Sequence, residues 1–233
     1  MPSFDDKCST ILDYFEKRTI DYPNENFLGT RTKLSNDSLG MPIFGEYTWK
    51  TNKEVETTVK CLTLAIEHRK LANQTEGDDK SWSFIGIWSK NRREWLETYI
   101  ANMYFNRTTI GFFDSMGVSA VDFILEQTEL SCIFCTPEYI SKIVGMKKEG
   151  LAKNVTSLVS FESVTPEQVS DCESSGVLLI EYQALIEEGK NLEKIDFRKC
   201  TADDCPIFSY TSGTTGDSKG VKLTHANLCA SAT

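Results

Sequence analysis

The chain has 233 residues, 40% of them hydrophobic and 11% aromatic, which is sufficient for a large folded core. Its formal charge of −9 at pH 7 argues against nucleic acid as the main partner, because phosphate backbones attract an excess of lysine and arginine. No stretch approaches the ~20 consecutive apolar residues that span a bilayer, and the amino terminus lacks the basic start and apolar run of a signal peptide.

Cysteine usage and the absence of a signal peptide both predict a cytoplasmic location. The eight cysteines are scattered, which fits reduced thiols better than a disulfide framework. We therefore interpret the Asn-X-Ser/Thr triplets as chance matches without a glycan. These triplets begin at Asn36, Asn73, Asn106 and Asn154.

The first part of the chain predicts helices around a loop or hairpin. Residues 5–22 have the apolar spacing of an amphipathic helix. The Gly/Ser/Asn-rich segment 30–42 predicts a loop or hairpin, followed by a short strand around 46–49. Further along, Thr51 and Glu54 have the spacing of a capping box, which predicts the start of another helix.

That second helix is predicted over 52–72, because apolar residues recur at helical intervals behind the capping box. The polar segment 73–81 predicts a loop. From residue 83 onward, short apolar strands alternate with helices. The expected strands are 83–88, 108–113, 131–136, 157–161, 176–180 and 206–210. The expected helices are 91–105, 119–126, 138–148, 166–171 and 182–188.

This alternation predicts an α/β fold with a mostly parallel sheet flanked by helices. Sheets of this kind bind ligands at the carboxyl ends of their strands, in the loops that lead onward. Strand 206–210 is expected to be the last of the set. The segment YTSGTTGDSKGVKLTH, which starts at Tyr210, would leave its carboxyl end.

Cysteine and histidine residues elsewhere carry weaker signals. Cys132 and Cys135 form the spacing CIFC, but they lie in an apolar strand, so we expect buried structural thiols rather than metal ligands. His68 and His225 are too far apart in sequence to suggest a site. We expect His225 to lie in the cap region of the final helix, and Asp114 to cap a loop rather than act as a catalytic acid.

The segment after strand 206–210 has the composition of a polyphosphate site. Glycines let the backbone approach a ligand, hydroxyls donate and accept hydrogen bonds, and a lysine adds a positive charge. The candidate residues are Thr211, Ser212, Gly213, Thr214, Thr215, Gly216, Lys219 and Gly220. The segment is not a Walker A motif, because Ser218 stands where that motif needs glycine. A surface connection is the alternative for any generic Gly/Ser/Thr loop.

The full order YTSGTTGDSKGV resembles the signature of the adenylate-forming, or AMP-binding, superfamily, in which this loop folds over the β- and γ-phosphates of ATP. It departs at Ser218, where the family usually has proline. Four upstream segments resemble the long-chain fatty acyl-CoA synthetases within that superfamily. They are ENFLGTR (25–31), YTWKTNKEV (47–55), IGIWSKNRREW (85–95) and GFFDSMG (111–117).

The resemblance implies that residues 1–233 form a partial N-terminal AMP-binding (adenylation) domain that ends just after the phosphate-binding loop. It implies a long-chain fatty acid–CoA ligase that uses ATP and Mg²⁺, with CoA as co-substrate and no nucleic-acid partner. Peripheral association of the complete enzyme with the cytosolic face of the endoplasmic reticulum or another membrane is compatible with this reading.

In that family the acyl tunnel, the adenine segment, the ribose-binding aspartate and the mobile C-terminal lysine lie downstream of the loop. We therefore expect no catalytic residue and no metal ligand in this chain, and no ligase activity from it alone. Two alternatives stay open. The chain could be a truncated, non-catalytic fragment or interaction module with a relic phosphate loop, or it could derive from another acyl- or aryl-CoA ligase.

Overall fold

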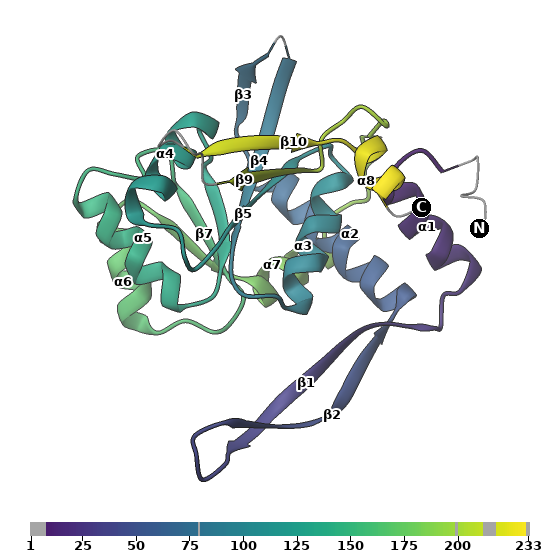
Figure 1. Cartoon of the computed structure of the whole chain (residues 1–233), viewed down its shortest axis with the longest axis horizontal. Coiled ribbons are helices and arrows are strands. Elements are labelled where there is room, and N and C mark those ends of the chain that lie inside the picture. Colours follow the sequence, from purple (N-terminus) through teal and green to yellow (C-terminus); the bar gives the residue numbers. More distant parts are fainter. Residues whose placement is uncertain (1–7, 79, 199, 212–217, 232–233) are drawn as a thin grey trace.

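A central sheet covered by helices on both faces forms the body of the protein, and a long hairpin extends away from it (Figure 1). The structure is a computed structural model that describes residues 8–78, 80–198, 200–211 and 218–231. The strands of the main sheet are β3 (Gln74–Gly77), β4 (Lys80–Trp88), β5 (Thr108–Phe112), β6 (Cys132–Cys135), β7 (Ser157–Ser160), β8 (Leu178–Glu181), β9 (Ile207–Thr211) and β10 (Lys219–Leu223). The separate hairpin consists of β1 (Asn26–Asn36) and β2 (Pro42–Thr51).

The main sheet is mostly parallel, as the alternating pattern predicts. Its strand order is β10-β9-β5-β4-β6-β7-β8, and every neighbouring pair from β9 to β8 is parallel. Two short strands run antiparallel: β10 pairs with β9, and β3 pairs with the start of β4. The carboxyl ends of six parallel strands therefore meet at one edge.

Helices bury both faces of this sheet. The helices are α1 (Ile11–Asp21), α2 (Asn52–His68), α3 (Arg93–Met103), α4 (Val118–Thr128), α5 (Glu138–Lys148), α6 (Pro166–Ser174), α7 (Tyr182–Lys190) and α8 (His225–Ser231). One core contains buried side chains of α4, α5 and α6, and the other contains those of α1, α2, α3 and α7. Over the described residues, none of the helices has the length and apolar character that crossing a bilayer demands.

Central strands contribute side chains to both cores, which explains why they read as continuous apolar runs. On β4, Phe84 and Trp88 enter the α4–α6 core, while Ile85 and Ile87 enter the other. Cys132 and Cys135 likewise face opposite sides of β6. The two thiols are free and buried, and burial raises the pKa of each. The expectation that both thiols are buried is confirmed.

Local capping signals explain where the first helices begin. The predicted helix over 5–22 starts only at Ile11 within the described residues, because Thr10 caps it in a capping box with Asp13. The capping box of Thr51 and Glu54 is present as predicted. The helix behind it ends at His68 rather than at residue 72.

One strand lies where the sequence predicts a loop, and a predicted hairpin is longer than expected. The segment 73–81 contains β3, which pairs with the start of β4, and three of the four β3 residues are exposed. The hairpin predicted near 30–42 is present but longer, since β1 and β2 pair from Asn26 opposite Thr51 to Asn36 opposite Pro42.

Candidate functional site

The predicted phosphate loop leaves the carboxyl end of a parallel strand. Thr109 and Ile110 of β5 lie in register with Ile207 and Phe208 of β9, so the two strands run in the same direction. The chain leaves β9 after Thr211, at the edge where the other parallel strands end. This is the place where open parallel sheets bind ligands.

The loop connects the two strands of a β-hairpin. Thr211, the last residue of β9, lies directly opposite Lys219, the first residue of β10, and both are exposed. The prediction that Lys219 lies in the loop is wrong, because Lys219 begins β10, which pairs back onto β9. β9 is the last parallel strand, as predicted, and β10 is antiparallel. The remaining predicted residues lie outside the described part of the chain: Ser212, Gly213, Thr214, Thr215 and Gly216.

One face of this hairpin is attached to helix α4 through Tyr210. The Tyr210 hydroxyl donates a 2.7 Å hydrogen bond to Oε1 of Gln127, and burial raises the pKa of Tyr210 to about 12. Opposite Tyr210, a Cβ on Gly220 would lie 3.1 Å from the tyrosine ring. Gly220 therefore has a packing role beside its predicted place near the ligand. Sequence reasoning missed Gln127, because no local pattern connects it to the loop.

Lys222 holds β10 against the turn between β3 and β4. It forms an ion pair with Asp78, and its Nζ lies 5.1 Å from the centroid of the Trp82 ring. Trp82 in turn packs edge-on against Phe208 of β9, with centroids 5.0 Å apart. Lys222 is therefore engaged by other residues of the protein, whereas Lys219 lies at the end of the hairpin from which the loop extends.

A cavity of about 370 Å³ lies at the same edge of the sheet, between the ends of β4 and β5. Its lining residues are Ser89, Lys90, Asn91, Trp95, Gly111, Phe112, Phe113 and Asp114. The half-exposed Asp114 accepts a hydrogen bond from the Tyr139 hydroxyl, and Lys90 Nζ lies 3.9 Å from its Oδ2. Burial and this carboxylate raise the pKa of Tyr139, which therefore remains a neutral donor. The contact fixes the loop after β5 to α5.

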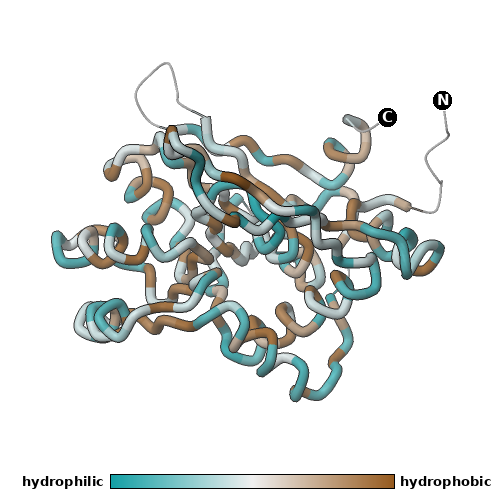
Figure 2. The backbone as a smooth tube through the Cα atoms, turned by 90° about the horizontal axis from the view of Figure 1, so that it is seen from below, coloured by the Kyte–Doolittle hydropathy of each residue, from teal (hydrophilic) through white to brown (hydrophobic). Residues whose placement is uncertain are grey.

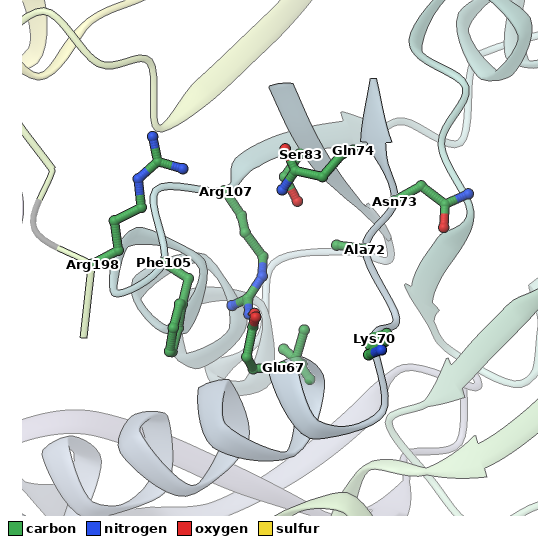
Figure 3. Close-up of a pocket in the computed structure, with 10 residues that line it drawn as sticks. Glu67, Lys70, Ala72, Asn73, Gln74, Ser83, Phe105, Arg107 and Arg198 are labelled. Atoms are coloured by element: carbon green, nitrogen blue, oxygen red, sulfur yellow. The ribbon is translucent and has the colours of Figure 1, made fainter. Parts of the chain in front are cut away.

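A second cavity, of about 440 Å³, lies at the opposite edge, where β4 and β5 begin (Figure 3). Its most conspicuous charged group is the buried Arg107, which runs down to Glu67. The guanidinium donates to Glu67 Oε2 at 2.5 Å and to Thr63 Oγ1 at 2.9 Å. The Arg107 charge is already paired with Glu67, and the predicted phosphate loop lies at the other edge of the sheet. We therefore do not assign this cavity to phosphate.

His225 has a structural position, as expected for a residue at the start of the final helix. It is buried, and its Nδ1 accepts a 3.2 Å hydrogen bond from the Ile11 backbone N–H, which joins α8 to α1. Burial lowers the pKa of His225 to about 4, against the opposing effect of Asp204 and Asp13. In the part of the chain that the structure describes, no three His, Cys, Asp or Glu side chains gather to hold a metal ion.

Comparisons with known proteins agree with the loop signature. A family model described as AMP-binding enzyme matches residues 31–233. Long chain acyl-CoA synthetase 2 from Arabidopsis thaliana is 34% identical over 216 residues, which cover 92% of this chain and 30% of that protein. Fatty acyl-CoA synthetase B from Dictyostelium discoideum is 28% identical over 225 residues, covering 96% and 31%. The chain thus spans less than a third of the length of these relatives.

Solved structures share the fold. The adenylation domain of a carboxylate reductase from Mycobacterium chelonae superposes with a TM-score of 0.75 at 17% identity, covering 95% of this chain and 35% of that one. The anthranilate CoA ligase AuaEII, in complex with anthranoyl-AMP, gives a TM-score of 0.68 at 14% identity, covering 93% and 35%. With the family match over residues 31–233, these results establish that the chain belongs to the AMP-binding enzyme family and resembles its long-chain acyl-CoA synthetases.

Proposed function

We propose that this chain is the N-terminal part of a long-chain fatty acid–CoA ligase. The observation that carries the proposal is the register of the β9–β10 hairpin, which sets the hydroxyl residue Thr211 opposite the cation Lys219 at the carboxyl edge of the parallel sheet. The connecting residues supply four further hydroxyls and two glycines. The names of the relatives support a fatty acid as the carboxylate that is activated.

In the proposed reaction, a fatty carboxylate attacks the α-phosphorus of ATP and pyrophosphate leaves; the CoA thiol then displaces AMP to form the thioester. The hydroxyls and backbone N–H groups of the loop would bind and orient the β- and γ-phosphates. The Lys219 ammonium would offset negative charge that develops on the departing pyrophosphate. Tyr210 and Gln127 would keep the hairpin in place under the loop.

The described residues fit ATP phosphates better than they fit a protein-bound metal. The Thr211 hydroxyl and the Lys219 ammonium belong to the strand pair next to the loop, and both are groups that contact phosphate oxygens. Mg²⁺ commonly keeps several waters and binds through substrate phosphates rather than through an all-protein cage. When bound, Mg²⁺ would neutralise part of the negative charge on the phosphates, and the Lys219 ammonium would neutralise a further part.

The test is to supply the gene product that contains this chain with ATP, CoA and palmitate. The expected result is palmitoyl-CoA, AMP and pyrophosphate in equal amounts, with little product when benzoate replaces palmitate. Preference for benzoate would instead assign an aryl-CoA ligase, and no pyrophosphate with any carboxylate would favour a non-catalytic module. The 233-residue chain alone is expected to release no pyrophosphate above background, since it spans less than a third of the length of its relatives.

A further inference from the structure

A third cavity, of about 520 Å³, lies between α2, the end of α7 and the segment that follows α7. The two helices are in contact there, since a Cβ on Gly189 would lie 2.0 Å from the Cys61 carbonyl oxygen. None of the lining residues belongs to β9, to β10 or to the two cavities described above. The volume falls within the range of about 300–1,000 Å³ that is typical of small-molecule sites.

The floor of this cavity is apolar. Leu64 is 6% exposed, and Phe197 packs against the buried Tyr104 with ring centroids 4.8 Å apart. Leu192 and Ile195, from the segment after α7, add two aliphatic side chains. Figure 2 shows that polar and apolar residues alternate along the helices of the body, so the space between two helices can offer both kinds of surface. The floor is suited to an alkyl chain.

Lysine side chains surround the floor, in a protein that is acidic overall. The residues that line the cavity include four lysines and two acids, a net charge of +2, whereas the chain carries −9. The lysines are Lys53, Lys60, Lys190 and Lys194. The first three have side chains that are 36% to 62% exposed, so they lie at the rim rather than at the floor. A cationic rim attracts an anionic group.

Part of this positive charge is not balanced within the protein. Lys53 and Lys60 share one carboxylate, because their ammonium groups contact Glu56 at 2.6 and 2.7 Å. Burial raises the pKa of Glu56, but the bonds and charges of the two lysines outweigh it and lower the pKa. The carboxylate is therefore ionised, and the three groups together keep a charge of +1. Lys194 forms no hydrogen bond or ion pair with any residue that the structure describes.

The remaining charges of the lining nearly cancel. Lys190 contacts the Glu187 carboxylate at 2.6 Å, and Asp196 balances one further lysine. One positive charge is left, which matches a single anionic group. The half-buried Cys61 lies near two of the lysines: Lys190 and Lys194 favour its thiolate, but burial has the larger effect and raises the pKa of Cys61. The wall of the cavity therefore contains a neutral thiol.

We propose that this cavity binds a single-chain amphiphile with one anionic head group, such as a fatty carboxylate or an alkyl phosphate. The alkyl chain lies on Leu64, Ile195 and Phe197. The head group lies beside Lys194 and the two lysines that Glu56 holds. The site shares no lining residue with the β9–β10 hairpin, and the inference does not depend on the proposed ligase activity.

The test is isothermal titration calorimetry of the 233-residue chain with laurate, dodecyl phosphate and dodecyltrimethylammonium, each below its critical micelle concentration. The three share one alkyl chain and differ in charge, so the cation should bind at least about tenfold more weakly than the tighter anion, which identifies the head group. Lys194→Gln should weaken anion binding about fivefold. The matched control is Lys148→Gln on α5, where the side chain is 57% exposed, and it should bind like the unmodified chain.

Two further measurements locate the ligand. Ile195→Ser, at a side chain that is already 47% exposed, should weaken binding of all three compounds about fivefold without changing their order. Alkylation by iodoacetamide at about pH 8.5, followed by mass spectrometry, reports on the thiols. A saturating anion should slow the reaction of Cys61 about tenfold. Cys229 on α8 is partly exposed and lies outside the cavity, so its rate should not change.

Several results would overturn the proposal. Neither anion could bind at concentrations up to about 1 mM, or the cation could bind as tightly as the anions. Equal losses in Lys194→Gln and Lys148→Gln would show that the overall charge of the chain, rather than this rim, attracts the anion. Anion binding that leaves the alkylation of Cys61 unchanged would place the ligand elsewhere on the protein.

Discussion

Replacing Gly189 with alanine should destabilise the protein, although alanine is the better helix former. Gly189 lies near the end of α7, where this helix crosses α2, and a Cβ there would be 2.0 Å from the Cys61 carbonyl oxygen and 2.6 Å from its carbonyl carbon. Both atoms are backbone, so the two helices would have to separate by about 1 Å or more to restore normal contact. Overpacking of this kind costs about 1–3 kcal/mol, against a gain of about 0.5–1 kcal/mol from helix propensity.

The chain offers a matched control in α5. A Cβ on Gly145 would meet no atom within 4 Å, so Gly145→Ala should stabilise the protein by about 0.5–1 kcal/mol. Urea unfolding at 25 °C, followed by circular dichroism, measures both variants against the parent chain with an unchanged denaturant slope. The two substitutions should shift the midpoint in opposite directions. A Gly189→Ala variant as stable as the parent would refute the close approach of α2 and α7.

Two further predictions concern buried polar groups. Tyr182→Phe should lower the free energy of unfolding by about 1.5–3 kcal/mol, because the hydroxyl donates a 3.0 Å hydrogen bond to Oε2 of the fully buried Glu97, and urea midpoints at pH 7 measure this loss. Stability should also fall as the pH is lowered from about 6.5 to about 4, because unfolded His225 takes up a proton that the folded form refuses. The contribution has a limiting slope of about 1.4 kcal/mol per pH unit, and a His225→Gln variant that keeps the full pH dependence would assign it to other groups.

The parts of the fold that follow from local chemistry could be predicted from the sequence. The capping box of Thr51 and Glu54 marks the start of α2, and the apolar runs of β4 and β6 indicate strands buried on both faces. β3 could not be found in this way, because Gln74–Gly77 has no apolar pattern and forms a strand only through its pairing with β4. β3 is a strand because it pairs with β4, and the spacing of apolar residues carries no information about such a pairing.

For the candidate site too, the local features could be predicted from the sequence, whereas the features that depend on strand pairing could not. Residue types and order predict a phosphate loop after β9, because that signal is contained in one short segment, and its role stays a prediction. Placing Lys219 in a strand required knowledge that β10 pairs back onto β9. The support from Gln127 to Tyr210 joins residues 83 positions apart, and it exists only because the sheet brings α4 next to the hairpin.

The most direct test of the phosphate-binding role compares Lys219→Gln with Lys222→Gln, which remove the same charge from the same strand. The measurement is ATP–pyrophosphate exchange with palmitate, in the gene product that contains this chain. Losing a charged contact to phosphate costs about 1.5–3 kcal/mol, so Lys219→Gln should slow exchange about ten- to a hundredfold. Lys222 is already paired with Asp78 on the protein surface, and its variant should stay close to the parent rate. Equal losses in the two variants, or full exchange in Lys219→Gln, would contradict the assignment of this loop to ATP.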